Sequence, residues 1–357
     1  VYKRQGLLSI GTGDLPEAEL DSAWYNVARV RRDLGGRSYV GGILTNSQRG
    51  DFRSTTAGVD GTWFITRDLS LFGDFLVVDD NGSEDSTTAA NIALDLTTDR
   101  WGFIFQFREV QEGFDPDLGF VRRDGYRKKN ASIRHSFRPG KLGIRRVTIR
   151  PNGQEYDSLV YGLRESREVN LNLEFELENG DELTFRASRE SERLFEEFEL
   201  DEDLVFAAGD YTFEYVRLEY ESDRSRRWGI EASVITGEFY DGDQEQLAGE
   251  LWFVFNRHFR ASGSYSTFDI TSEHGAVDWR LWSARLDYIH SSTLSTSCFA
   301  QHNSSTGDTD LNLRLRKILR NDSDLFVVLN ERTIEDEILG EFRERDFAVK
   351  ISYRFFL

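Results

Sequence analysis

The sequence lacks methionine altogether and contains one cysteine and four prolines among its 357 residues. The single cysteine, Cys298, excludes an internal disulfide, and its serine and threonine neighbours offer no metal-ligand spacing. Aromatic residues are plentiful by contrast, with 27 phenylalanines, 13 tyrosines and 7 tryptophans. Many aromatics together with little proline favour many β-strands joined by turns.

Long hydrophobic runs are also missing. No stretch approaches the roughly 20 consecutive apolar residues that a membrane-spanning helix needs, and the mean hydropathy is -0.52. A transmembrane β-strand exposes only alternate residues to lipid, so its mean hydropathy can be equally low. The net charge of -19 excludes a nucleic-acid partner, because phosphate binding needs a basic surface.

The chain begins Val1-Tyr2-Lys3-Arg4-Gln5 and shows no basic segment followed by an apolar one, as a secretion signal would. We therefore expect the sequence to be a fragment. A secretion signal, with or without an N-terminal domain, is expected upstream.

Strict alternation of apolar and polar residues is the strongest pattern in the chain. From Val169 to Glu178 every odd position is apolar and every even position is polar, which predicts a β-strand. Asn179-Gly180 follows and is a strong hairpin signal, and alternation resumes over 183–188. Residues 101–108 and 311–316 alternate in the same way.

The connections between these runs alternate in length, with about nine short ones against about ten longer or more polar ones, which predicts about twenty strands. The longer connections are expected at 17–22, 47–52, 79–88, 110–128, 155–168, 195–212, 239–246, 269–279, 304–308 and 334–343. Short turns on one side and longer loops on the other are typical of barrels in the outer membrane of Gram-negative bacteria. We predict an all-β protein: one domain over residues 1–357 that is a closed antiparallel transmembrane β-barrel of about 20 strands (range about 16–22), with short periplasmic turns and longer extracellular loops.

The last strand carries an apolar stripe that fits this prediction. Closure against the first strand would protect such an edge from aggregation. The terminus also resembles the C-terminal assembly signal of outer-membrane barrels, although it ends in leucine and not in an aromatic residue. The predicted assembly signal comprises Val349, Ile351, Tyr353, Phe355 and Leu357.

Four further segments carry a resemblance to a family. They are Ala28-Arg29-Val30-Arg31-Arg32-Asp33-Leu34, Arg37-Ser38-Tyr39-Val40-Gly41, Gly58-Val59-Asp60 and Phe114-Asp115-Pro116-Asp117-Leu118-Gly119-Phe120-Val121-Arg122-Arg123. With them the chain resembles an uncharacterised bacterial outer-membrane β-barrel family whose longer members carry an N-terminal family-9 carbohydrate-binding-like domain, which is absent here. The resemblance implies the location and the fold, and at most a link to glycans or their fragments.

Catalytic and metal chemistry find little support. None of the five histidines stands in a metal-binding motif, and we predict neither a metal site nor a cofactor. Ser272-Glu273-His274 and His302-Asn303-Ser304 are the only local clusters of nucleophile and base, and neither lies in a nucleophile-elbow motif. We predict that the protein is not an enzyme, with an outer-membrane hydrolase as a remote alternative.

Basic residues concentrate in the segment 119–129 of an otherwise acidic chain. Such a loop could enter the barrel as a constriction that attracts anions, or it could be a solvated extracellular loop that binds lipopolysaccharide phosphates. Charged residues that alternate with the apolar stripe must line a wet interior, because Arg or Lys at the bilayer midplane costs about 2–4 kcal/mol. The candidate lumen and constriction residues are Arg108, Arg122, Arg123, Arg127, Arg134, Glu174, Glu176, Arg186, Arg285, Arg314, Arg316, Lys350 and Arg354.

The sequence therefore favours a porin-like outer-membrane barrel that forms a loop-constricted channel or transporter for small polar solutes. Only the family resemblance implies a link between these solutes and glycans. A surface-exposed binding or anchoring barrel with a closed lumen is the alternative. The expected partners are outer-membrane lipid and lipopolysaccharide, the barrel assembly machinery and a small-molecule solute.

Overall fold

The structure is a computed structural model that describes residues 3–14, 21–83, 85–202, 204–320, 323–336 and 340–353. It consists of 22 β-strands, and the described residues include no helix. No described helix could therefore span a membrane. The chain forms two compact units, of which unit 1 comprises Val1–Phe137, Thr148–Leu171 and Glu190–Arg193, and unit 2 comprises Arg138–Val147, Asn172–Arg189 and Leu194–Leu357.

Unit 1 holds the first eight strands. They are β1 (Lys3–Thr12), β2 (Ala23–Gly35), β3 (Ser38–Arg49), β4 (Phe52–Phe64), β5 (Leu69–Asp80), β6 (Thr87–Thr97), β7 (Trp101–Val110) and β8 (Tyr126–Phe137). Three further strands contribute residues to both units: β9 (Ile144–Ser158), β10 (Leu163–Leu177) and β11 (Glu182–Leu194).

Unit 2 holds the remaining strands. They are β12 (Phe198–Asp201), β13 (Leu204–Phe206), β14 (Gly209–Glu221), β15 (Trp228–Phe239), β16 (Gly242–Val254), β17 (Phe259–Ser272), β18 (Gly275–Ser291), β19 (Leu294–Asn303), β20 (Thr309–Arg320), β21 (Ser323–Asp336) and β22 (Gly340–Ser352).

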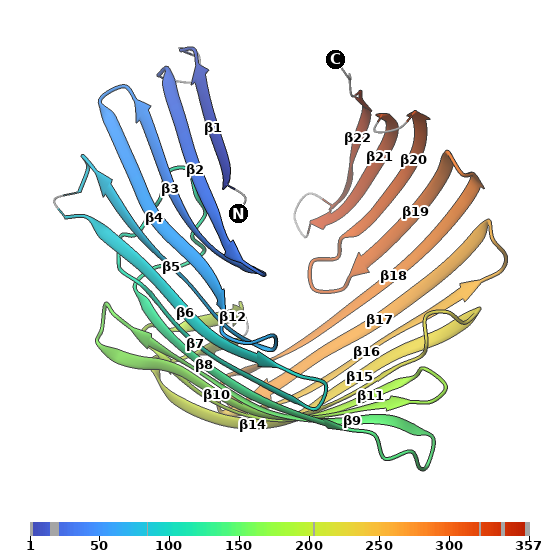
Figure 1. Cartoon of the computed structure of the whole chain (residues 1–357). Helices are drawn as coiled ribbons and strands as arrows, with labels where there is room; N and C mark the ends of the chain where they lie inside the picture. Colours follow the sequence, from blue (N-terminus) through green and yellow to red (C-terminus); the bar gives the residue numbers. More distant parts are fainter. Residues whose placement is uncertain are drawn as a thin grey trace. The chain divides into compact units, whose positions relative to one another are not determined.

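The strands follow one another as an antiparallel meander. Each strand from β1 to β8 pairs with its successor in the chain, as Figure 1 shows for β1 to β4. The same holds from β14 to β22. The large sheet has 20 strands, and β12 and β13 form a separate two-stranded sheet. The prediction of about twenty antiparallel strands is therefore confirmed for the large sheet. Closure of this sheet into a barrel would require β1 to pair with β22, and it is part of the proposal below.

In an antiparallel meander, successive connections lie alternately at the two opposite ends of the strands. We call the end with the predicted short connections the turn end, and the end with the predicted longer connections the loop end. The predicted hairpin at Asn179-Gly180 is at the turn end, where Gly180 adopts a φ of 87° and its amide donates to the Leu177 carbonyl oxygen at 3.1 Å. A positive φ of this kind is easily adopted by glycine, so the Asn-Gly pair suits this turn.

Three of the predicted longer connections are tight hairpins instead, and the one expected at 47–52 is the two-residue turn Gly50-Asp51. The connection expected at 239–246 is the two-residue turn Tyr240-Asp241, and the one expected at 269–279 is Glu273-His274. The strands on either side continue pairing up to Phe239↔Gly242 and Ser272↔Gly275. Residues 243–246 are polar on both faces, and at 269–279 the apolar residues Ile270, Val277 and Trp279 lie on the polar face. The apolar alternation that identifies a strand is therefore absent or reversed there.

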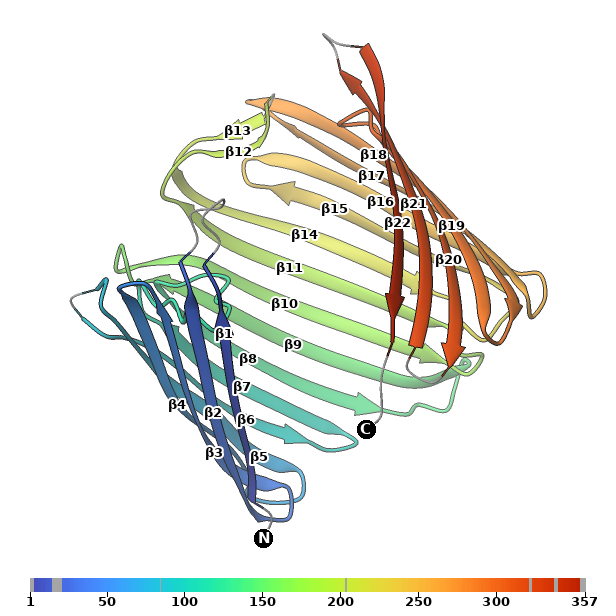
Figure 2. The ribbon, with the colours of Figure 1, turned by 90° about the horizontal axis from the view of Figure 1, so that it is seen from above.

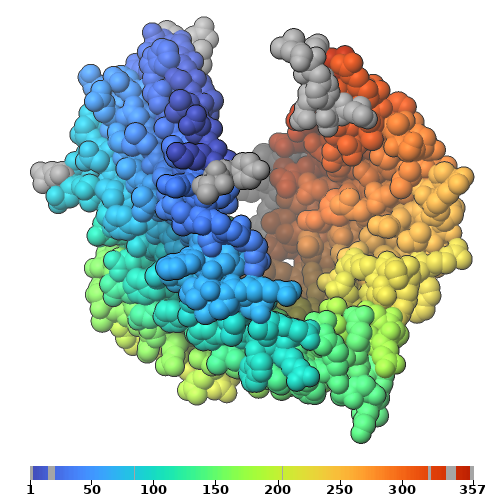
Figure 3. All heavy atoms as spheres, in the orientation of Figure 1, coloured from blue at the N-terminus to red at the C-terminus, as the bar shows by residue number. Residues whose placement is uncertain are grey.

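The large sheet has one apolar and one polar face. On the apolar face of unit 1, Val59 pairs with Phe75, and these side chains are 58% and 46% exposed. On the polar face of the same strands, Asp60 pairs with Asp74, which pairs with Asn91. Figure 3 shows the strands of unit 1 as a continuous layer of atoms, blue to cyan. An exposed apolar stripe opposite a polar face is the arrangement expected of a sheet that contacts lipid on one side.

Among the described residues, the two clusters of buried apolar side chains lie where connections fold onto the polar face. Figure 2 shows the β12–β13 hairpin of unit 2 beside the end of β18. The hairpin brings Leu204 and Phe206, both fully buried, against Phe213, Ile270 and Val277. The Nε1 group of Trp279 donates to Asp201 of the hairpin at 2.9 Å. Trp279 therefore belongs to this cluster on the polar face.

Candidate functional site on the polar face

The connection between β7 and β8, residues 111–125, folds onto the polar face of unit 1, and we call it the inward loop. Its anchor is Phe114, which is 4% exposed and packs with Val78, Ala89 and Val110. Val78, Ala89 and Val110 lie on the polar face, because they alternate with the exposed residues of β5, β6 and β7. Of the two readings of this basic segment, the structure therefore favours a loop that covers the polar face.

Ion pairs and backbone contacts fix the loop at three points. Asp117 at its tip forms an ion pair with Arg49 at the end of β3, and Arg123 forms one with Glu165. The amide of Gly113 donates to Asp124 at 2.6 Å, which joins the two ends of the loop. The hydrogen bond to Glu165 raises the pKa of Arg123 above its ordinary value, so this guanidinium stays charged.

A cavity of about 560 Å³ lies between the loop and the sheet. Arg108 on β7 and Arg122 on the loop line it, together with Asp74 and Asn91. Among the described residues neither Arg108 nor Arg122 forms an ion pair. The Asp74 carboxylate accepts a hydrogen bond from Asn91 Nδ2 at 3.0 Å. The cavity therefore combines two unpaired guanidinium groups with one carboxylate that is hydrogen bonded to an amide.

Aromatic rings form another wall of this cavity. The rings of Tyr126 and Tyr156 lie 5.6 Å apart, and both line it. The Arg123 guanidinium lies 5.7 Å and 5.9 Å from these two ring centres, and Lys128 Nζ lies 4.8 Å from that of Tyr156. Rings beside cations hold the basic groups in place by cation–π attraction.

Arg127 is separated from this group by the strand register. Residue pairs Glu109↔Arg127 and Arg108↔Lys128 alternate, so Arg127 projects from the face opposite to that of Arg108. It forms an ion pair with Glu109 at 2.7 Å. Of the predicted constriction residues on this loop and its strands, the structure brings together Arg108, Arg122 and Arg123 but not Arg127.

Three other predicted lumen residues are held by hydrogen bonds on the polar face. Arg134 donates to the Thr98 carbonyl oxygen at 2.7 Å at the turn end of unit 1. In unit 2, Arg186 donates to Asn172 Oδ1 at 2.7 Å. Glu176 accepts ion pairs from Arg145 and Arg146 at 3.0 Å and 3.3 Å.

Glu174 lies two residues before Glu176 on β10 and therefore on the same face. This residue takes part in a polar interaction and is therefore not a free charge on this face.

The C-terminal strands carry the remaining lumen candidates on one face. Directly opposite residues in neighbouring strands share a face, and the pairs Arg285↔Phe299 and Phe299↔Asn312 connect β18 to β20. Arg314 and Arg316 follow Asn312 at steps of two residues and so lie on the same face. The pairs Arg316↔Phe326 and Phe326↔Lys350 extend this face to β22. Arg285 lies 5.0 Å from the Phe299 ring centre and Arg314 lies 4.6 Å from that of Phe326. Arg354 lies outside the described residues.

The predicted assembly signal is described in part. Val349, Ile351 and Tyr353 are all exposed, and Val349 and Ile351 pair with Val327 and Leu325 on the apolar face. Phe355 and Leu357 lie outside the described residues.

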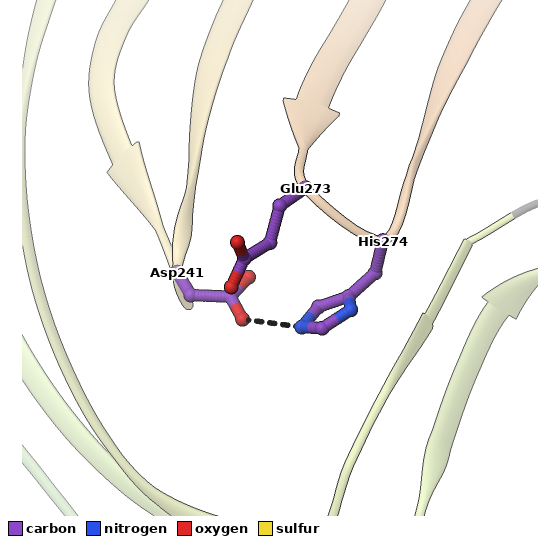
Figure 4. A group of neighbouring side chains, drawn as sticks. All are labelled: Asp241, Glu273 and His274. Atoms are coloured by element: carbon purple, nitrogen blue, oxygen red, sulfur yellow. Dashed lines mark ion pairs between the residues drawn. The ribbon is translucent and has the colours of Figure 1, made fainter.

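Within the part of the chain that the structure describes, one group of side chains could hold a metal ion. Asp241, Glu273 and His274 meet at the loop end of unit 2, with ligand atoms within 4.8 Å of one another (Figure 4). His274 Nε2 already pairs with Asp241 Oδ2 at 3.0 Å, and all three residues are exposed. An ion pair between two exposed hairpin turns accounts for this arrangement.

The predicted nucleophile clusters are otherwise engaged. Ser272 Oγ accepts from the backbone amide of His274 at 2.9 Å, and Ser304 Oγ accepts from that of Arg280 at 2.8 Å. His302 Nδ1 contacts the Thr309 hydroxyl at 3.0 Å. Neither cluster has its serine beside its histidine ring.

Sequence reasoning missed the two anchors on the polar face. Phe114 with Val121, and Leu204 with Phe206, are apolar residues inside acidic connections. Isolated apolar residues in a polar loop could have indicated that the loop packs onto the sheet, because a fully solvated loop gains no stability from apolar side chains.

No family model matches the chain, and no curated protein matches it. Solved structures do match its fold. A mutant of the ferric enterobactin receptor PfeA from Pseudomonas aeruginosa aligns with a TM-score of 0.56 at 10% identity, over 98% of this chain and 71% of that chain. The ferric-catecholate import receptor Fiu from E. coli K12 gives 0.51 at 7% identity over 93% and 70%, and the copper transporter OprC gives 0.52 at 11% identity over 98% and 73%.

At such identities the likeness shows the fold alone. Three facts agree: a meander of antiparallel strands, an apolar face exposed along its length, and solved outer-membrane receptors with the same fold. The prediction of an all-β, antiparallel fold of the outer-membrane barrel type is confirmed, and the exposed apolar face agrees with the predicted outer-membrane location. The chain has the fold of the outer-membrane β-barrels that serve as receptors and transporters.

Proposed function

We propose that the chain closes into an outer-membrane barrel by pairing β1 with β22, and that it conducts small polar solutes past a constriction formed by the inward loop. In this barrel the apolar face contacts lipid and the polar face lines the lumen. The turn end is periplasmic and the loop end is extracellular. Lipopolysaccharide, the assembly machinery and the link to glycans remain predictions within this proposal.

The observation that supports the proposal is that residues 111–125 pack onto the polar face. An extracellular loop without a role inside the barrel would be solvated, whereas Phe114 is buried against three strands of this face. The loop brings Arg122 and Arg123 to a cavity that also holds Arg108. Pores select solutes through charged side chains at such narrow places. The printed names of the similar structures, receptors for ferric siderophores and a copper transporter, support passage of small solutes.

A second candidate is a barrel with a closed lumen that binds a ligand at the cell surface. The β12–β13 hairpin favours it, because this hairpin also packs onto the polar face, over β14, β17 and β18. Two inward segments could together obstruct a lumen. The same experiment separates the two candidates.

The test is single-channel conductance of the refolded chain in planar bilayers. Replacing Phe114 by Ala removes the anchor of the loop, and such a change in a buried cluster costs about 3–5 kcal/mol. We expect a larger conductance and passage of larger solutes. Leu118→Ala is the matched control, because Leu118 lies in the same loop, is exposed and does not line the cavity. Silent bilayers for every variant favour the closed barrel, and equal conductance of the two variants contradicts the loop constriction.

A further inference from the structure

We propose that a second cavity, at the turn end of unit 2, binds an oxyanion, that is, the phosphate or carboxylate group of a small solute. The cavity measures about 680 Å³ and is bounded by the ends of β16 to β20. Ligand pockets for small molecules have volumes of about 300–1,000 Å³. The proposal names the solute class for the transport proposed above, but the binding itself does not depend on transport.

The charge of the cavity is positive although the chain is acidic. Its lining includes four arginines, Arg257, Arg260, Arg314 and Arg316, against a single acidic residue, Asp287. Among the described residues, Arg260 and Arg314 form no ion pair. In a chain with a net charge of -19, unpaired arginines at one place mark a surface that attracts anions.

The strand register places the two unpaired arginines on either side of one carboxylate. Arg260 is opposite Asp287 on β18, Asp287 is opposite Ser297 on β19, and Ser297 is opposite Arg314 on β20. These four residues form one row across the polar face. Asp287 compensates one positive charge at most, so an anion that enters the row still meets a net positive charge.

Packing orients the guanidinium groups. Arg314 lies over the ring of Phe326 at 4.6 Å, and stacking on a ring leaves the N–H groups at the edge of the guanidinium free to donate. Arg316 is held by Asp324 at 3.1 Å and lies 5.7 Å from the same ring. Stacked guanidinium groups with free edges suit bidentate binding of a carboxylate or a phosphate.

Hydroxyl groups complete the cavity. Its lining includes Ser291, Ser292, Thr293, Ser295, Thr296 and Ser297 along the turn and start of β19. Hydroxyls donate to oxyanions without adding charge. On the proposed topology the cavity is at the periplasmic end of the solute path.

The experiment is isothermal titration of the folded full chain in detergent with inorganic phosphate, and in a second series with succinate. Low ionic strength, about 0.01 M, keeps the Debye length near 30 Å. Saturable binding of either anion is expected. Arg260→Gln and Arg314→Gln should each weaken it at least about 10-fold, the usual effect of losing one hydrogen bond to a charged group.

The matched control is Arg332→Gln. Arg332 lies on the same face as Arg314, but toward the loop end, and it already pairs with Asp310 at 2.9 Å. Its replacement should leave the affinity within about 2-fold, because one exposed pair contributes little. Absence of binding, or equal weakening by all three variants, overturns the proposal. A barrel that binds anions without conducting contradicts only the proposed transport, and one that conducts without binding contradicts only this site.

Discussion

Asp181 is a charged residue whose surroundings make it a structural anchor. It lies in the turn between β10 and β11 and is 4% exposed. Its carboxylate accepts hydrogen bonds from the Asp223 amide at 3.0 Å and the Tyr220 hydroxyl at 2.8 Å, and it pairs with Arg226 at 2.6 Å. Burial alone would raise the pKa of Asp181, but these three partners hold that pKa below its ordinary value of 3.8. One carboxylate therefore joins two neighbouring turns of unit 2.

Replacing Asp181 by Asn should lower the free energy of unfolding by about 1–3 kcal/mol, because buried donors lose a charged acceptor. Urea unfolding from lipid vesicles measures the change. Glu182→Gln, at the next position but exposed and without a partner among the described residues, should have little effect. Equal effects of the two variants would show that the network around Asp181 contributes nothing special.

The pH dependence follows from the direction of the shift. A carboxyl whose pKa is lowered on folding stabilises the fold fully above its unfolded pKa, here 3.8, and this contribution is lost as the pH falls through the lower folded pKa. The difference in unfolding free energy between the native chain and Asp181→Asn should therefore be constant near neutral pH and shrink below 3.8. A difference that shrinks already at neutral pH would contradict this assignment.

Strand β22 shows how one element contacts two environments. Ile351 pairs with Leu325 and is 65% exposed on the apolar face. The next residue, Ser352, pairs with Asp324 on the polar face. Neighbouring positions of this strand should therefore differ sharply in their tolerance of charge.

Ile351→Arg should impair insertion, because Arg at the midplane costs about 2–4 kcal/mol, falling toward the interface. Ser352→Arg places its charge beside Asp324 and should be tolerated. The measurement is the yield of folded, heat-modifiable protein in outer-membrane fractions. Similar yields for both would reverse the assignment of faces in β22.

The sequence allowed elements to be predicted where alternation is strict and the turn residues are specific. Residues 169–178 and Asn179-Gly180 gave a strand and a hairpin that the structure contains. The polar strand ends at Tyr240-Asp241 were read as loop, because polar residues on both faces carry no period. The burial of Phe114 on the polar face depends on contacts with residues up to 36 positions away in the chain, so the local sequence pattern could not predict it.

The same reasoning explains the lumen candidates. In their strands Arg108, Arg314 and Lys350 alternate with apolar neighbours. Because successive side chains of a strand point to opposite faces, this alternation alone predicted that they lie on the polar face. Arg127 lies in a basic run without an apolar phase, and only the pairing with Glu109 separates it from Arg108. The unpaired state of Arg260 is a property of three-dimensional neighbours that sequence does not record.

The proposed orientation of the protein can be tested by surface labelling. Epitope tags inserted at Gly82 or Ser305, exposed at the loop end, should be accessible on intact cells, while a tag at Lys141, exposed at the turn end, should not be. Asp117 and Asp201 are poor insertion sites despite lying in loop-end connections, because they pair with Arg49 and Trp279. Labelling at Lys141 on intact cells would invert the topology.

The meander also determines how such a protein can change in size. The pairings from β1 to β8 and from β14 to β22 join strands that are neighbours in the chain, so a hairpin in these runs depends only on the strand before it and the strand after it. In the proposed barrel, deleting or duplicating two consecutive strands would leave every other register intact and move only the seam at which the first and last strands meet. A lineage with this barrel could therefore widen or narrow its bore in steps of one hairpin, and an engineer could do the same without redesigning the strands that remain.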